Sequence, residues 1–247
     1  MRPVSIAVLT EDSAKDAHAV VQCLLRAMLK LIDEQLPLYD QNRIKLQPSE
    51  DPEKKAMRGN LWQAHTSRQA RILLQRYMER QLKRTDVEGF VIVHVDGDRP
   101  YRQSKAGTES HNQARFEKDI FSKLRVSLQD RPELLERVVL MVPFYSIEAW
   151  LYQNTQAALR LYGAEPYCTH TTHIERFREW QQDPAVLDEI EKPKEAVSLG
   201  DRFNHELASQ RFPAQRVYEV EKSFHKSVER LRACAPLLAA LLATRSP

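Results

Sequence analysis

The feature that most constrains the fold is the apolar run Phe90–Val95, which ends abruptly in the triplet Asp96-Gly97-Asp98. A short apolar run of this kind is typical of a strand buried on both faces, as in a parallel sheet. Side chains two residues apart point to the same side of a strand, so Asp96 and Asp98 can converge on one point. Two close carboxylates repel each other unless a cation lies between them, and oxygen ligands suit Mg²⁺, Ca²⁺ or Mn²⁺. The triplet is also compatible with an ordinary turn in which Gly97 takes a positive φ and the aspartates cap backbone amides.

Strand-like and helix-like segments alternate through the first 150 residues. Short apolar runs predict strands, and apolar residues spaced by three and four predict helices. The expected order is a strand at 3–9, a helix at 14–36, a strand at 43–46, a helix at 67–84, the strand at 90–95, a helix at 110–129 and a strand at 137–142. This alternation predicts an α/β fold with a mainly parallel sheet flanked by helices.

The remainder of the chain, residues 153–247, contains no convincing strand and is predicted to be a C-terminal helical extension packed on the domain formed by residues 1–152. Prolines interrupt its helical pattern at Pro166, Pro184, Pro193 and Pro213, with a further break near Pro236. No linker-like segment separates the two parts, so we expect one continuous body.

The composition, 42% hydrophobic and 29% charged, is that of a soluble globular protein. No apolar run is long enough to span a membrane, so we expect a cytoplasmic protein without a membrane partner. The net charge of +3 permits a local basic face. The sequence has neither a P-loop nor a G-x-G-x-x-G motif, which excludes those two glycine-rich nucleotide sites.

Acidic residues follow three of the predicted strands. Glu11 follows the first, Asp96 and Asp98 follow the central one, and Glu148 comes shortly after the last. Ligands bind at the carboxyl ends of parallel strands, where the loops diverge, so these acids are predicted to share a divalent-metal site. Each acid alone could instead cap or begin a helix. Glu148 stands among apolar residues, however, and a buried carboxylate is costly unless a positive group faces it.

At these acids the chain resembles the Toprim domain, which is shared by type IA and type II topoisomerases, bacterial primases and OLD-family nucleases. The family's glutamate after the first strand corresponds to Glu11, and its Asp-x-Asp after a later strand corresponds to Asp96 and Asp98. The segments 143–151 and 191–195 resemble small bacterial Toprim-like proteins related to OLD nucleases, which are often found in phage-defence loci. The resemblance covers roughly residues 3–152 and these later segments.

The resemblance implies a nuclease that hydrolyses phosphodiester bonds with two Mg²⁺ or Mn²⁺ ions in antiviral defence. The implied ligands of the first ion, with Glu11 also taking part in catalysis, are Glu11, Asp96 and Asp98. The implied ligands of the second ion are Asp98 or Asp96 together with Glu148 and Ser146. A lysine that assists the chemistry would be Lys194 or Lys192.

One departure from the family lies after the first strand. The OLD-like pattern has a glycine after the glutamate and an acid four residues on, where this chain has Asp12 and Lys15. Asp12 and Asp16 are therefore both candidates for the remaining metal ligand.

The expected substrate is nucleic acid, with DNA preferred to RNA. Arg99, Arg102 and Lys105, in the loop after the aspartates, are candidate contacts to its backbone, although a solvated loop would look the same. OLD-type enzymes carry their own ATPase, so a chain without a P-loop implies a separately encoded ATPase partner or independent action. Two other functions stay open: a module that binds nucleic acid or a partner without catalysis, and a phosphoryl-transfer enzyme acting on a nucleotide.

Overall fold

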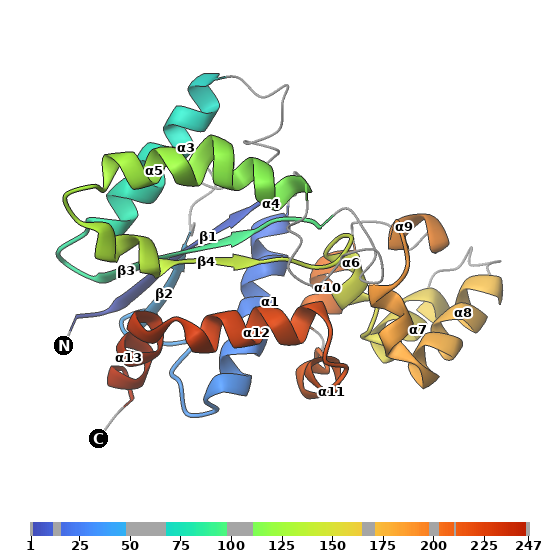
Figure 1. The fold of residues 1–247 in the computed structure, drawn as a ribbon. Coiled ribbons are helices and arrows are strands. Elements are labelled where there is room, and N and C mark those ends of the chain that lie inside the picture. Colours follow the sequence, from blue (N-terminus) through green and yellow to red (C-terminus); the bar gives the residue numbers. More distant parts are fainter. Residues whose placement is uncertain are drawn as a thin grey trace.

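A computed structural model of the chain describes residues 2–11, 16–47, 68–97, 111–164, 171–197, 203–209 and 211–245 (Figure 1). The strands in these ranges are β1 (Val4–Thr10), β2 (Ile44–Gln47), β3 (Glu88–His94) and β4 (Val138–Met141). They form one sheet in the order β2-β1-β3-β4, and every neighbouring pair is parallel. The predicted α/β class, with a parallel sheet flanked by helices, is confirmed.

The helices of the first half are α1 (Ala17–Ile32), α3 (Arg68–Leu82), α4 (His111–Phe116), the π-helix η2 (Glu117–Phe121), α5 (Ser122–Ser127) and the 3₁₀-helix η3 (Pro132–Arg137). Those of the second half are α6 (Glu148–Leu151), α7 (Thr155–Ala164), α8 (Thr171–Gln182), the 3₁₀-helix η4 (Pro184–Asp188), α9 (Pro193–Ala196), α10 (Asn204–Ser209), α11 (Ala214–Glu219), α12 (Ser223–Ala233) and α13 (Ala235–Ala243). Within the described ranges, no helix is both long and apolar enough to cross a membrane.

The alternation of side chains along β1 separates two hydrophobic cores. Val4, Ile6 and Val8 face a core built with α1 and the later helices, whereas Ala7 and Leu9 face a second core built with α3, α4, η2 and α5. All seven residues of β1 are buried, as a strand covered on both faces requires. Figure 1 shows α3 and α5 over one face of the sheet and α1 and α12 over the other.

The helices of the C-terminal part share the core of the sheet. α10, α11 and α12 contact α1, and α12 also contacts β4. Helices α6 to α10 gather beyond the carboxyl ends of the strands (Figure 1). Pro184 and Pro193 begin η4 and α9, and Pro213 precedes α11, because proline fits the first turn of a helix and not its interior. Pro166 lies outside the described residues.

Two helices differ from the predictions in ways that have local causes. The helix expected at 14–36 spans Ala17–Ile32, because Asp33 adopts extended backbone angles and its carboxylate accepts the Gln35 amide. The helix expected at 110–129 is interrupted by the π-turn η2 between α4 and α5. The apolar spacing that predicted this helix does not distinguish an α-turn from a single wider turn.

Candidate functional site

Glu11 and Asp96 meet where β1 and β3 end. The register pairs Thr10 with His94, so both strands stop at the same level, and the Glu11 amide donates to the His94 carbonyl (3.2 Å). Glu11 is buried, and its Oε2 accepts the Asp96 amide at 3.0 Å. Asn112, in the first turn of α4, donates to Glu11 Oε2 (3.5 Å) and to the Asp96 carbonyl (3.0 Å). The Glu11 carboxylate therefore holds the backbone of Asp96 in place through a hydrogen bond.

His94 sits directly behind the Asp96 side chain. Its Nε2 lies 3.2 Å from Asp96 Oδ1, and its Nδ1 lies 3.1 Å from Thr10 Oγ1. The imidazole is fully buried, whereas the Asp96 side chain is 24% exposed. Asp96 Oδ1 is a buried oxygen that has no partner with hydrogen-bond geometry among the described residues. An acceptor held in this way is suited to a further positive partner.

Gly97 brings the end of β3 against the segment that follows β4. A Cβ at this position would lie 2.1 Å from the Phe144 carbonyl oxygen and 2.5 Å from that of Pro143. The φ of Gly97 is outside the left-handed region, so the alternative interpretation of a turn with positive φ is wrong. Glycine is required here because two stretches of backbone touch.

Glu148 begins α6 and is buried to 1% exposure. Its Oε1 lies 3.1 Å from Lys194 Nζ and accepts a hydrogen bond from Asn204 Nδ2 at 3.0 Å. Its Oε2 accepts the Ser146 hydroxyl at 2.6 Å. The prediction that a positive group faces this carboxylate is confirmed by Lys194.

The charge state of Glu148 depends on opposing effects. Burial raises the pKa of Glu148, and the nearby Lys194 ammonium opposes that rise. The Asp96 carboxylate raises the pKa of Glu148 further, whereas the hydrogen bond from Ser146 lowers it. The charge of Asp96, just after β3, therefore acts on Glu148 at the start of α6.

Lys194 and Lys192 have different partners. Lys192 takes a left-handed conformation before α9, and its Nζ pairs with Glu195 at 2.7 Å on the exposed surface. Lys194, two residues later, reaches the buried Glu148 instead. Between the two predicted candidates, the structure therefore places Lys194 in the site.

Of the remaining predicted site residues, the structure describes only Asp16. Asp16 immediately precedes α1, where its carbonyl accepts the Val20 amide and its side chain makes no capping hydrogen bond. The following lie outside the described residues: Asp12, Asp98, Arg99, Arg102 and Lys105.

Two amide side chains contact the acids although the sequence interpretation did not select them. Asn112 bridges Glu11 and the Asp96 carbonyl, and Asn204 donates to Glu148 from a position 56 residues further along the chain. An asparagine near the start of a helix is usually read as a cap, so neither position carries a local signal. Both are buried, to 2% exposure, as polar groups that serve another buried polar group tend to be.

The donor set fits a hard divalent cation in part. Within the described ranges, no group of three or more His, Cys, Asp and Glu side chains is close enough to hold a metal ion. The Glu11 carboxylate accepts the backbone amide of Asp96, and the charge of the Asp96 carboxylate raises the pKa of Glu148. Carboxylate oxygens at a strand edge, one of them a buried acceptor, are the ligands that Mg²⁺ and Mn²⁺ prefer.

The sequence matches no protein-family model and no curated protein. Among solved structures, the chain is similar to the C-terminal region of the Burkholderia pseudomallei OLD protein, with a TM-score of 0.48 and 14% sequence identity over 94% of this chain and 98% of that one.

Proposed function

We propose that the protein is a divalent-metal-dependent nuclease that hydrolyses phosphodiester bonds at the carboxyl edge of its sheet. One observation supports this most directly: the Glu11 carboxylate accepts the Asp96 backbone amide where β1 and β3 end, the Asp96 charge raises the pKa of the buried Glu148 at the start of α6, and Lys194 Nζ lies 3.1 Å from Glu148 Oε1. This is the arrangement that the motif resemblance to Toprim and OLD-related proteins implies. The edge is also where ligands bind in open parallel sheets.

Glu11, Asp96 and Glu148 would hold Mg²⁺ or Mn²⁺, with Asp98 and one of Asp12 or Asp16 as further ligands. When bound, two such ions would supply an acidified water for attack and a counter-charge for the leaving oxygen. The hydrogen bond from the Asp96 amide fixes Glu11, so its carboxylate is oriented before any ligand arrives.

The second half of the chain supplies the groups around Glu148. Ser146 and Asn204 each donate to one of its oxygens and hold the carboxylate in one orientation. The Lys194 side chain is 45% exposed, so its ammonium can reach solvent as well as Glu148. We assign to Lys194 the stabilisation of negative charge that develops on the phosphate in the transition state.

The partners in this proposal follow from the resemblance alone. The substrate would be DNA, which Arg99, Arg102 and Lys105 would contact through its backbone. A separately encoded ATPase would act with the protein in defence against phage, within the cytoplasm.

The proposal is tested by incubating the purified protein with supercoiled plasmid, linear single-stranded and double-stranded DNA, and RNA, in Mg²⁺ or Mn²⁺. Asp96→Ala and Glu148→Gln are each expected to lower the cleavage rate by roughly 100-fold or more, because each removes preorganised charge. Glu195→Gln is the matched control, since this acid is 68% exposed and pairs only with Lys192 among the contacts described.

Cleavage that survives in Asp96→Ala would refute the assignment of these residues. Binding of nucleic acid without cleavage under every condition would support the non-catalytic module instead. Hydrolysis of free nucleotides with no cleavage of polymers would support a phosphoryl-transfer enzyme.

A further inference from the structure

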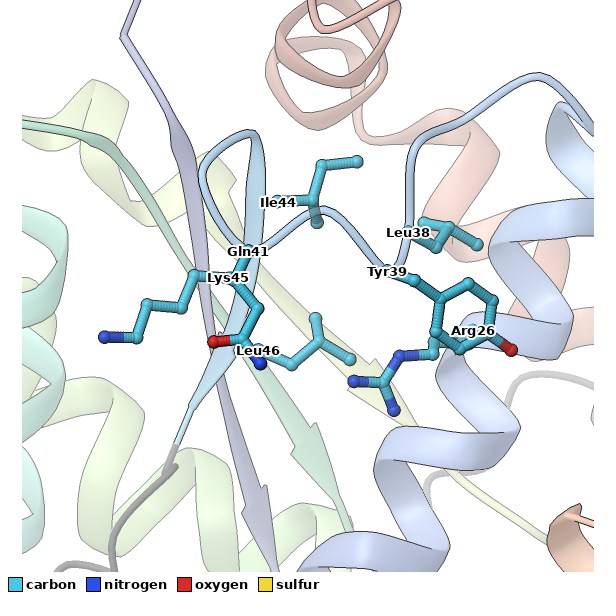
Figure 2. A pocket seen from close by; sticks show the side chains of 7 residues that line it. All are labelled: Arg26, Leu38, Tyr39, Gln41, Ile44, Lys45 and Leu46. Atoms are coloured by element: carbon cyan, nitrogen blue, oxygen red, sulfur yellow. The ribbon is translucent and has the colours of Figure 1, made fainter.

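A pocket at the β2 edge of the sheet has a composition unlike that of the acidic site. It lies between the middle of α1 and the edge strand β2, and its cavity volume is about 100 Å³ (Figure 2). Buried Leu38, Ile44 and Leu46 form its apolar floor. Its polar rim consists of Arg26, Tyr39, Gln41 and Lys45. We call this feature the edge pocket.

Tyr39 presents an aromatic ring to solvent beside two cations. It is 73% exposed, the highest value among the large exposed hydrophobic residues of the described ranges. Arg26 and Lys30, one turn apart on α1, each lie 5.5 Å from the ring centroid. Such cation–π contacts stabilise the ring in one position while its remaining surface stays open.

The loop that carries Tyr39 is held by its own hydrogen bonds. The Leu38 amide donates to the Leu36 carbonyl at 2.8 Å, and the Asp40 amide donates to the Pro37 carbonyl at 3.0 Å. Two backbone bonds on either side of Tyr39 fix its Cα. The aromatic ring is therefore presented from an ordered platform, which lowers the entropy that binding would cost.

The edge pocket is positively charged. Its lining contains no carboxylate, and within the described ranges Arg26, Lys30 and Lys45 form no ion pair. The adjoining loop carries three acids, of which Asp40 pairs with Arg43 at 3.3 Å and Asp33 pairs with Arg245, whereas Glu34 forms no ion pair within the described ranges. The buried Nε of Arg26 has no acceptor among the described residues. Figure 2 shows the Arg26 guanidinium reaching from α1 toward β2.

We propose that the edge pocket binds one unpaired nucleotide of a single-stranded nucleic acid. The base would stack on Tyr39, and the neighbouring phosphates would lie against Arg26, Lys30 and Lys45. Stacking on an exposed aromatic ring within a cationic groove is the general mode by which proteins bind single strands. The proposal rests on the proposed nuclease function only for the choice of ligand.

The edge pocket is separate from the acids, but one single-stranded nucleic acid could contact both. Lys45 pairs with Ser5 in the sheet, and Glu11 lies six residues further along the chain. At about 3.3 Å per residue the separation is about 20 Å, which equals about six stacked nucleotides at 3.4 Å each. A single-stranded nucleic acid bound at the acids would thus reach the edge pocket about six nucleotides away.

The test measures binding of fluorescein-labelled (dT)₁₂ by fluorescence anisotropy in EDTA, so that cleavage does not contribute. Tyr39→Ala is expected to weaken binding by about 5- to 150-fold, and Tyr39→Phe is expected to bind as the wild type does. The double change Arg26→Gln with Lys30→Gln should reduce the slope of log affinity against log salt by about 1.4, from two lost phosphate contacts.

The matched control is Lys118→Gln with Lys123→Gln, which removes two charges from η2 and α5 on the opposite side of the sheet. If this control weakens binding as much as the Arg26 and Lys30 pair does, attraction is a general surface effect and the proposal is overturned. Equal affinity of wild type and Tyr39→Ala also overturns it. Competition by dTMP at the same concentration as (dT)₁₂ would show a free-nucleotide site and overturn the single-strand assignment.

The outcomes separate the two proposals. A protein that cuts no nucleic acid but binds (dT)₁₂ through Tyr39 contradicts the nuclease proposal and supports the edge pocket. A protein that cuts DNA and binds (dT)₁₂ equally well without Tyr39 supports the nuclease proposal and contradicts the edge-pocket proposal.

Discussion

Replacing Asp188 by asparagine should stabilise the protein above neutral pH. Asp188, at the end of η4, is 1% exposed, and its Oδ1 accepts the Ser223 hydroxyl at 2.7 Å. Ser223 in turn accepts a hydrogen bond from Trp150 Nε1 at 2.6 Å, which links Asp188 to the helix α6 that begins with Glu148. Burial raises the pKa of Asp188 from 3.8 to about 7, although the Ser223 hydrogen bond and the Lys222 charge oppose the rise.

The size of the effect follows from proton linkage. Below pH 3.8 Asp188 is protonated in both the folded and the unfolded chain, so its titration makes no difference to stability. Between pH 3.8 and about 7 only the unfolded chain loses this proton, so the free energy of unfolding falls as pH rises. The interval spans about three pH units, and at about 1.36 kcal/mol each the full loss is about 4 kcal/mol, complete above pH 7.

The variant Asp188→Asn cannot ionise, but its side-chain oxygen still accepts the Ser223 hydroxyl. We therefore expect it to match the protonated wild type near pH 4 and to exceed the wild type by about 4 kcal/mol at pH 8. For a chain of 247 residues this corresponds to a midpoint of thermal unfolding that is higher by roughly 8 to 16 °C. Urea unfolding of both proteins from pH 4.5 to 8.5 measures the difference directly.

The comparison must be made between the two proteins and not within one of them, because the raised pKa of Glu148 also changes wild-type stability with pH. Ser209→Ala, a change in the last residue of α10, is a control that should leave the pH dependence unaltered. A stability difference between Asp188→Asn and wild type that stays constant from pH 4.5 to 8.5 would refute the reasoning. So would a variant that is less stable at pH 8.

Two further changes test the geometry of the candidate site. Gly97→Ala should lower the free energy of unfolding by about 1–3 kcal/mol and lower cleavage, because its Cβ would meet the Phe144 carbonyl oxygen at 2.1 Å. Gly163→Ala is the control: a Cβ there would have nothing within 4 Å, so the change should be neutral or stabilising by up to about 1 kcal/mol. Urea unfolding of both variants measures the difference. Asn204→Ala should lower the free energy of unfolding by about 1–3 kcal/mol and raise the pKa of Glu148 further, because the carboxylate loses a buried hydrogen-bond donor. Equal urea-unfolding curves for this variant and the wild type would contradict that role.

The sheet was predictable because its signal is local. Three of the four predicted strands are short apolar runs and the one at 43–46 alternates polar and apolar residues. The observed strands lie within one or two residues of the predicted ends, as β3 at Glu88–His94 and β4 at Val138–Met141 show. The positions of Glu11, Asp96 and Glu148 followed from the rule that parallel strands end at one edge. The positive partner of Glu148 followed from the cost of burying a charge.

The contacts that complete the site were not predictable in the same way. Asn204 reaches Glu148 because α10 packs against α6 and α1, and no spacing within the sequence encodes that packing. Gly97 illustrates a related limit. The sequence shows a glycine between two aspartates, but only the fold shows that it is required by the backbone of residues 143–144 and not by its own φ. The choice between Lys192 and Lys194 likewise depended on the conformation at the start of α9.

The packing of the last helices on α1 has a consequence for synthesis on the ribosome. The apolar face of α1 is covered by α10, α11 and α12, and the hydrogen bond from Arg43 to the Thr244 carbonyl spans 201 positions. At a synthesis rate of about 5–20 residues per second, Thr244 leaves the ribosome roughly 10 to 40 s after Arg43. During that time the nascent chain exposes one face of its first helix. A chaperone that binds apolar helices is therefore expected to engage α1 first and to be released only when α12 docks.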